Sequence, residues 1–220
     1  MKYFTKKIIA VLLTVMLTGI TVLHVSRGQT IKVNAAQTFK VHFIDVGAAD
    51  GALLQYGEGE NAKYALIDSG AYSYETTDHD TIDVSDRVHQ YLLDHGVKHL
   101  EFILLTHPHQ DHIGGMEKIL SDTTIKIDKI YGNDLNIQYL KSSEDKNKQS
   151  SDETNWTEFD TQTYKNFKAA LEARKKLAEE AEDKTEKENL KVDYVVPTAG
   201  ETINFGEAKM TFYGPLENDY

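Results

Sequence analysis

The first clear alternation of apolar and polar residues begins at Phe39. Phe39, Val41 and Phe43 alternate with polar residues, which predicts a strand with these three side chains on a buried face. His42, which lies between two of them, is expected to face solvent. A run of small residues follows and ends the predicted strand.

Further strands and helices follow from similar patterns. Helices are predicted after the cap residues 83–86, ending at Gly96, and over Met116–Ser121. A continuous apolar run at 102–105 predicts a strand buried on both faces. The other predicted strands are Ala52–Tyr56, 64–68, 125–131, 192–196, Thr202–Phe205 and 208–213. Because strands alternate with helices and buried strands mix with half-buried ones, the predicted fold class is α/β with a mixed sheet.

A charged segment at 141–191 interrupts this series, with 11 basic and 13 acidic residues. Its second half, 164–187, has apolar residues at helical spacing. We predict a loop followed by an amphipathic helix on the domain surface, which makes the segment an insertion and not a separate domain. The charges most simply form a solvated face, and binding to a partner is the alternative.

Residues 1–36 have the layout of a secretory signal. Lysines come first, followed by an uncharged run at 8–23 and small residues up to Ala36. That run has sixteen residues, whereas a membrane-spanning helix needs about 20. We therefore expect export, cleavage near Ala35 or Ala36, and secretion of a domain at 37–220. The alternative is an uncleaved segment 8–23 that anchors the domain to the outer face of the cell membrane.

Composition and charge narrow the function classes. The chain has no cysteine, which excludes disulfides, cysteine-based zinc ribbons and thiol nucleophiles. Its formal net charge is −11, and residues 37–220 keep 19 of the 24 basic residues and all 35 acidic ones, a balance of −16. Such a surface disfavours non-specific nucleic-acid binding unless a metal supplies positive charge. The sequence contains no Gly-x-Ser-x-Gly elbow and no P-loop. It therefore gives no support to the hypotheses that the protein is a serine hydrolase or an NTPase.

Four potential metal ligands lie within six residues directly after the buried strand: His107, His109, Asp111 and His112. Imidazole and carboxylate are the ligands that zinc accepts where thiolates are absent. Alternate residues at a strand end share a face, so His107 and His109 can point the same way. Asp111 and His112 follow where the chain turns into the next helix. One loop could thus hold two metal ions with two ligands each, and the alternative is a chance group of surface histidines.

At these residues the chain resembles the metallo-β-lactamase-fold hydrolase superfamily, whose hallmark is His-x-His-x-Asp-His after a strand. The blocks at 43–50, 65–70 and 102–115 follow the order seen in the hydrolase domain of competence DNA-uptake proteins (ComEC-like). Bacterial surface phosphorylcholine esterases are similar across the same blocks. The resemblance implies a four-layer αββα sandwich with two zinc ions at one edge of the sheets.

The resemblance also implies roles and a function. His107 and His109 would bind the first zinc, and Asp111 and His112, which are also the predicted catalytic residues, the second. The implied protein is an exported zinc-dependent hydrolase that uses a metal-bound hydroxide on phosphoester or phosphodiester bonds. Its substrate would be a small-molecule, cell-wall-linked or nucleic-acid phosphoester. The alternative is a non-catalytic, surface-displayed module with a vestigial metal site.

Two further aspartates match the family in position. Asp68 corresponds to a buried aspartate on the strand before the motif, which would support the ligand loop without binding metal. Asp68 could equally be a turn former beside Ser69 and Gly70. Asp50 lies in a turn of small residues near the site. It could support the metal ligands, or it could be an ordinary turn aspartate.

The chain also departs from the family pattern. The family adds a further histidine, a Gly-Asp pair whose carboxylate bridges the metals, and a late histidine. Here no histidine follows His112, and no Gly-Asp pair occurs. We therefore expect residues 37–220 to contain the N-terminal half or so of the sandwich, truncated on its C-terminal side and holding half of the ligands.

Overall fold

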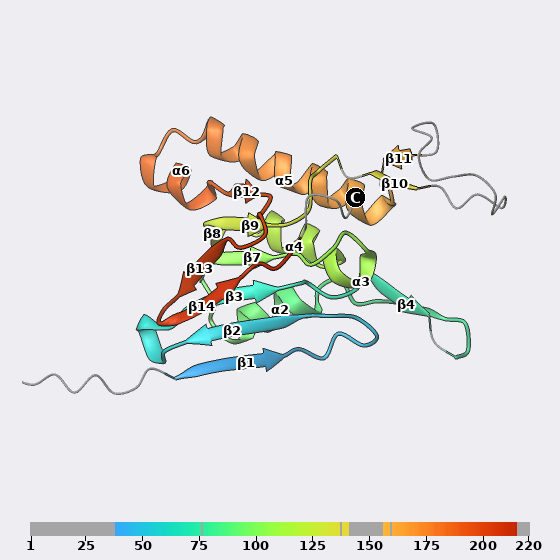
Figure 1. Cartoon of the computed structure of the whole chain (residues 1–220), viewed down its shortest axis with the longest axis horizontal. Helices are drawn as coiled ribbons and strands as arrows, with labels where there is room; N and C mark the ends of the chain where they lie inside the picture. The colour runs from blue at the N-terminus through green and yellow to red at the C-terminus, as the bar shows by residue number, and fades with distance from the viewer. Residues whose placement is uncertain (1–37, 76, 137, 141–155, 159, 215–220) are drawn as a thin grey trace, which may run out of the picture. The chain divides into compact units, whose positions relative to one another are not determined.

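The computed structural model describes residues 38–75, 77–136, 138–140, 156–158 and 160–214 (Figure 1). The predicted signal segment and the first part of the predicted insertion lie outside these ranges. Among the described residues, no helix is both long enough and apolar enough to cross a membrane.

A six-stranded mixed sheet forms the centre of the domain. Its strands, in spatial order, are β1 (Phe39–Phe43), β2 (Ala52–Tyr56), β3 (Lys63–Ile67), β7 (Phe102–Leu104), β9 (Lys129–Tyr131) and β12 (Asp193–Val195). The first three form an antiparallel meander, and β3, β7, β9 and β12 pair in parallel. The predicted α/β class with a mixed sheet is confirmed.

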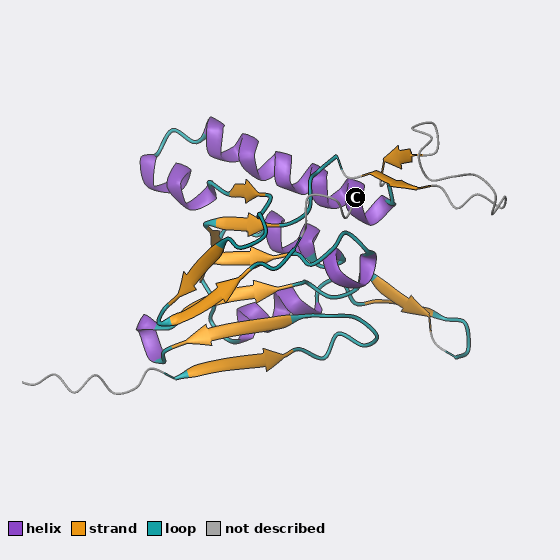
Figure 2. Cartoon of the chain, viewed as in Figure 1, coloured by secondary structure: helices purple, strands orange, loops and turns teal. Residues whose placement is uncertain are grey.

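The remaining elements surround this sheet (Figure 2). The helices are α2 (Arg87–Asp94), α3 (Gln110–Ile113), α4 (Met116–Ser121), α5 (Gln162–Glu180) and α6 (Lys184–Leu190), with a 3-10 turn η1 (Gly59–Asn61). Four two-stranded pairs complete the described residues: β4 (Ser73–Glu75) with β5 (Thr81–Asp83), β6 (His99–Leu100) with β8 (Lys126–Ile127), β10 (Gln138–Leu140) with β11 (Trp156–Glu158), and β13 (Thr202–Phe205) with β14 (Ala208–Thr211).

The central sheet has an apolar layer on each face. On one face Leu53, Leu66 and Ile103 are aligned across neighbouring strands and are buried together with residues of α2, α4 and α5. On the other face the hairpin β13–β14 covers the sheet, and the rings of Phe102 and Phe205 meet edge-on at 5.7 Å. Figure 1 shows this hairpin, in red, in front of the strands. Helices therefore cover one face and strands the other.

The face of β1 that was predicted to be buried is exposed. Its three apolar side chains are exposed, Phe43 at 87%. His42 is partly buried, with Nδ1 2.9 Å from the hydroxyl of Tyr91 in α2. The buried apolar face and the solvent-facing His42 were both predicted wrongly. The reason is that β1 is an edge strand, and the side of it that carries His42 faces α2. The apolar side of β1 has one ring contact among the described residues: the ring of Phe39 meets that of Phe205 in β13.

Two predicted elements are each divided in the structure. The strand predicted at 125–131 becomes β8 and β9, which join different sheets. The helix predicted at 164–187 becomes α5 and α6. Asp183 begins α6 as its cap, and its carboxylate accepts the N–H of Glu186 at 2.8 Å. Aspartate favours this cap position over a helix interior, which explains the break.

Helix α5 buries a charged residue at its centre. Arg174 is 1% exposed. Its guanidinium donates five hydrogen bonds to the main-chain carbonyls of Leu120, Asp122, Ile125, Asn189 and Leu190. These acceptors lie at the ends of α4 and α6 and between α4 and β8, and carbonyls at helix C-termini carry partial negative charge. Arg174 thus joins α5 to the ends of two other helices.

Candidate metal centre

The predicted ligand loop lies at the edge of the sheet where the parallel strands end. It follows β7, and β7 pairs with β3, so Asp68 after β3 lies beside Thr106 after β7. Helix α3 begins at Gln110, which puts Asp111 and His112 in its first turn. Ligand sites of α/β folds typically lie beyond the carboxyl ends of such strands.

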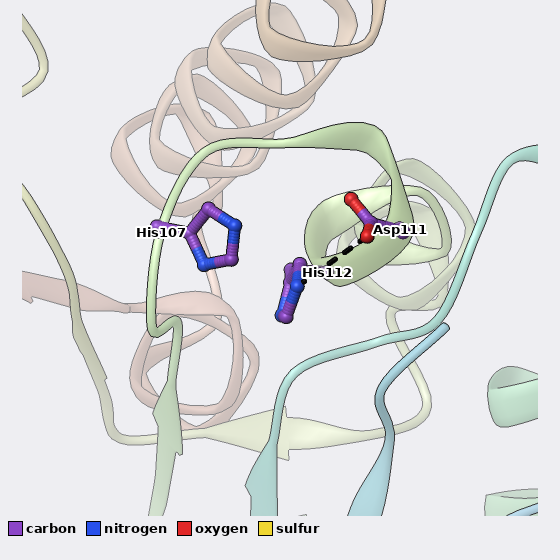
Figure 3. A group of neighbouring side chains, drawn as sticks. All are labelled: His107, Asp111 and His112. Atoms are coloured by element: carbon purple, nitrogen blue, oxygen red, sulfur yellow. Dashed lines mark ion pairs between the residues drawn. The ribbon is translucent and has the colours of Figure 1, made fainter. Parts of the chain in front are cut away.

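Three predicted ligands come together here. His107, Asp111 and His112 each offer a ligand atom that lies within 4.8 Å of the other two. Figure 3 shows their side chains gathered between the loop and α3. Nε2 of His112 is 3.6 Å from Oδ2 of Asp111, and the ring centroids of His107 and His112 are 3.8 Å apart. Two imidazoles and a carboxylate therefore share one small volume.

His109, the fourth predicted ligand, lies beside this group. Its ring centroid is 4.8 Å from that of His107, with the ring planes at 84°. Its carbonyl accepts the N–H groups of His112 and Ile113 at 3.1 and 3.0 Å, which starts α3. The predicted division of the ligands between two ions, and the catalytic roles of Asp111 and His112, stay predictions.

Asp68 is placed to hold the ligand loop. It is 2% exposed, and its φ of 55° is a left-handed conformation that aspartate tolerates better than most residues. Oδ1 accepts the main-chain N–H of Thr106 at 2.8 Å. Oδ2 lies 2.8 Å from Nδ1 of His112, which donates to it because a carboxylate only accepts. Asp68 therefore bonds both Thr106 and His112, and its predicted roles, as support of the ligand loop or as a turn former, stay predictions.

Asp50 approaches the same histidine from another loop. Its Oδ2 is 3.5 Å from Nε2 of His112, and its side chain is 72% exposed. Its N–H donates to the carbonyl of Asp111 at 3.0 Å, and its carbonyl accepts the N–H of Gly70 at 2.8 Å. Asp50 therefore brings a carboxylate to the ligand group and also ties together the backbones around it.

Close backbone packing fixes the start of α4 behind the ligands. A Cβ on Gly114 would lie 1.9 Å from the main-chain N of Tyr72, and one on Gly115 would lie 2.4 Å from the carbonyl O of Ser69. Such contacts require glycine at both positions. The N–H of Ser69 also donates to the carbonyl of His112 at 2.6 Å. The segment after β3 thus lies directly against the ligand loop.

The electrostatic surroundings keep His107 neutral. Partial burial and then the neighbouring imidazoles of His112 and His109 lower the pKa of His107 below its ordinary value. A neutral imidazole at pH 7 has a free lone pair, which metal binding requires.

The residues fit a divalent transition metal. Zinc binds imidazole nitrogen and carboxylate oxygen, and those are the three donors present. Metal-binding histidines commonly donate their second ring N–H to a carboxylate, as His112 does to Asp68. Both the donor set and its hydrogen-bond support therefore match a metal site.

One residue of the site was not predicted. The hydroxyl of Thr106 lies 2.7 Å from Oδ2 of Asp68 and 3.2 Å from Nδ1 of both His107 and His112. Its place directly before His107 was visible in the sequence, but its partner Asp68 is 38 residues away along the chain. Only the pairing of β3 with β7 brings the two together.

Comparison with known families decides the identity of this fold. A family profile described as "Beta-lactamase superfamily domain" matches residues 81–215, more than half of the chain. The chain belongs to the beta-lactamase superfamily. This membership confirms the metallo-β-lactamase fold and supports a metal-dependent hydrolase by resemblance. The narrower likeness to ComEC-like proteins and phosphorylcholine esterases stays a prediction.

Other comparisons add little to the superfamily assignment. No curated protein matches the sequence. Among solved structures, a crystal structure of a diphosphatase from the PhnP family is similar at 15% identity, with a TM-score of 0.33. The alignment covers 74% of this superfamily member and 41% of that diphosphatase, so the chain spans less than half of that relative's length.

Proposed function

We propose that this protein is a zinc-dependent hydrolase of small phosphoesters that works outside the cytoplasm. The observation that carries the proposal is the group of His107, Asp111 and His112, with its ligand atoms within 4.8 Å of one another. The choice of zinc rests on the donor types, because imidazole and carboxylate without thiolate suit this metal. Export rests on the signal-like layout of residues 1–36.

Each residue of the site has a defined task in this proposal. His107 and His112 present imidazole nitrogens, and Asp111 adds a carboxylate. Asp68 holds the proton on Nδ1 of His112 and so directs Nε2 of that ring away from itself. Asp50 supplies a further carboxylate oxygen next to the same Nε2. Bound zinc would supply the positive charge that activates water and stabilises the developing negative charge on the phosphoester.

The charge of the site favours a small substrate over a polyanion. At the site, the side chain of Asp50 is 72% exposed and that of Asp111, in the first turn of α3, is 46% exposed. Residues 37–220 carry a balance of −16. A nucleic acid would bring a long row of phosphates against these carboxylates, whereas a small phosphoester brings a single phosphate that the metal offsets.

The test measures metal content and hydrolysis on the full chain. We expect zinc to stay bound after loading and dialysis, as measured by elemental analysis. We also expect the zinc-loaded protein to hydrolyse bis-p-nitrophenyl phosphate faster than single-stranded DNA. His109→Ala should reduce the rate at least ~100-fold.

His99→Ala is the matched control, because His99 pairs with Asp128 on the exposed surface. Its rate should equal that of the unaltered protein. If the protein retains zinc but does not hydrolyse the substrate, the proposed enzymatic activity is wrong and the protein is a non-catalytic metal-binding module.

A further inference from the structure

We propose that Thr106 is a positioning residue that sets the tautomer of His107 by relaying a hydrogen bond from the buried Asp68. The inference rests on the proposed metal site, since its purpose is to aim Nε2 of His107 at a metal. It concerns the protons of the metal-free protein, so it can be tested without any hydrolytic assay.

The direction of each hydrogen bond follows from the chemistry of the partners. Asp68 is almost fully buried, and its carboxylate can only accept. The hydroxyl of Thr106 has one proton, and its 2.7 Å distance to Oδ2 of Asp68 is shorter than its 3.2 Å distance to Nδ1 of His107. Hydrogen bonds to a charged acceptor are shorter and stronger than those between neutral groups, so Thr106 donates to Asp68.

The state of His107 then follows from the proton of Thr106. Since the only hydroxyl proton of Thr106 points to Asp68, its oxygen acts as an acceptor toward Nδ1 of His107. His107 must therefore carry its proton on Nδ1, which leaves the lone pair on Nε2. In a neutral imidazole only one ring nitrogen carries the proton, so this hydrogen bond decides which nitrogen keeps the lone pair.

His112 reaches the same carboxylate without a relay. Its Nδ1 lies 2.8 Å from Oδ2 of Asp68 and 3.2 Å from the hydroxyl of Thr106. One oxygen of Asp68 thus fixes both rings, His112 directly and His107 through Thr106. Because His112 contacts Asp68 directly, it serves as an internal reference for a change at Thr106.

The experiment is nitrogen-15 NMR of the histidine rings in metal-free protein at pH 7.5, with His107 assigned by the loss of its signals in His107→Gln. In the unaltered protein we expect both His107 and His112 to be protonated on Nδ1. Thr106→Val keeps the shape of the side chain but removes the hydroxyl. It should shift His107 toward the Nε2-protonated form and leave His112 unchanged.

Two further variants separate this role from a structural one. Thr106→Ser restores a hydroxyl and should restore the tautomer of His107, whereas Thr123→Val makes the same change at another exposed threonine and should alter neither ring. Zinc affinity, measured by competition with a chelating dye, should fall ~10-fold or more in Thr106→Val and recover in Thr106→Ser. An Nε2-protonated His107 in the unaltered protein, or one unchanged in Thr106→Val, would overturn the inference.

Discussion

At the scale of single residues, the site depends on a carboxylate that is not itself among the three gathered donors. Asp68 accepts three hydrogen bonds from the loop after β7, one from the main chain and two from side chains. Its left-handed backbone turns the chain so that both oxygens face this loop. Side-chain chemistry and backbone conformation are therefore both required at this position.

Asp68→Asn separates these two requirements. Asparagine also tolerates the left-handed region, so the backbone should remain as it is. The amide carries no charge and offers one acceptor oxygen where the carboxylate offers two, so His112 and Thr106 cannot both be satisfied as before. We expect zinc affinity to fall 10- to 100-fold in a chelator-competition titration. An affinity equal to that of the unaltered protein would show that Asp68 does not orient the ligands.

The candidate ligands His107, His109, Asp111 and His112 are close in sequence, so a local pattern was sufficient to propose them, and three of them lie together in the structure. Their supporting residue Thr106 was not proposed. Thr106 acts through Asp68, and that contact exists only because two strands far apart in the chain pair in the sheet. A contact of this kind leaves no periodic signal along the sequence.

At the scale of elements, α5 is held in the domain by a buried cation. Its apolar side was predicted from helical spacing, but the burial of Arg174 was not. Burial of a guanidinium depends on carbonyl groups from three separate segments, and these acceptors are known only once the fold is known. The face of β1 was mispredicted for a related reason, because alternation within a strand does not reveal which neighbour covers it.

Arg174→Met tests this role of α5. Methionine has a similar length but no donors, so five main-chain carbonyls would each lose a hydrogen bond, three of them buried. We expect the free energy of unfolding, measured by urea denaturation, to fall by about 3 kcal/mol. Lys176→Met on the exposed side of the same helix is the control and should change it by less than about 0.5 kcal/mol. Equal losses of stability in the two variants would show that Arg174 does not hold α5 in the domain.

At the scale of the whole molecule, two helices on the same face of the sheet, α2 and α4, are joined by an acid-sensitive contact. Nε2 of His89 in α2 lies 2.8 Å from Oδ2 of Asp122, which follows α4. Burial alone would raise the pKa of Asp122, but hydrogen bonds from Thr124 and His89 outweigh it and lower that pKa. The ionised form is therefore favoured by folding.

The lowered pKa of Asp122 predicts that the free energy of unfolding falls as the pH becomes acidic. The folded pKa of Asp122 lies below its ordinary value of 3.8, so its contribution is present above about pH 4 and is lost as the pH falls through the folded pKa. Asp122→Asn should lower the free energy of unfolding by about 1 kcal/mol at pH 7 and flatten its decline below pH 4. Urea denaturation across pH 2.5–7 measures both, and an equally steep acid decline in the variant would contradict the assignment.

The order of the strands has a consequence for synthesis on the ribosome. The meander β1–β2–β3 pairs residues close in sequence, so a nascent chain can complete it, together with Asp68, before His112 is translated. Strand β9 pairs with β7 on one side and on the other with β12, where Tyr131 meets Val195, and closing the long segment between β9 and β12 slows folding. A nascent chain halted before α5 would already contain His112 and its supporting carboxylate Asp68 but would lack the helix that packs against α4.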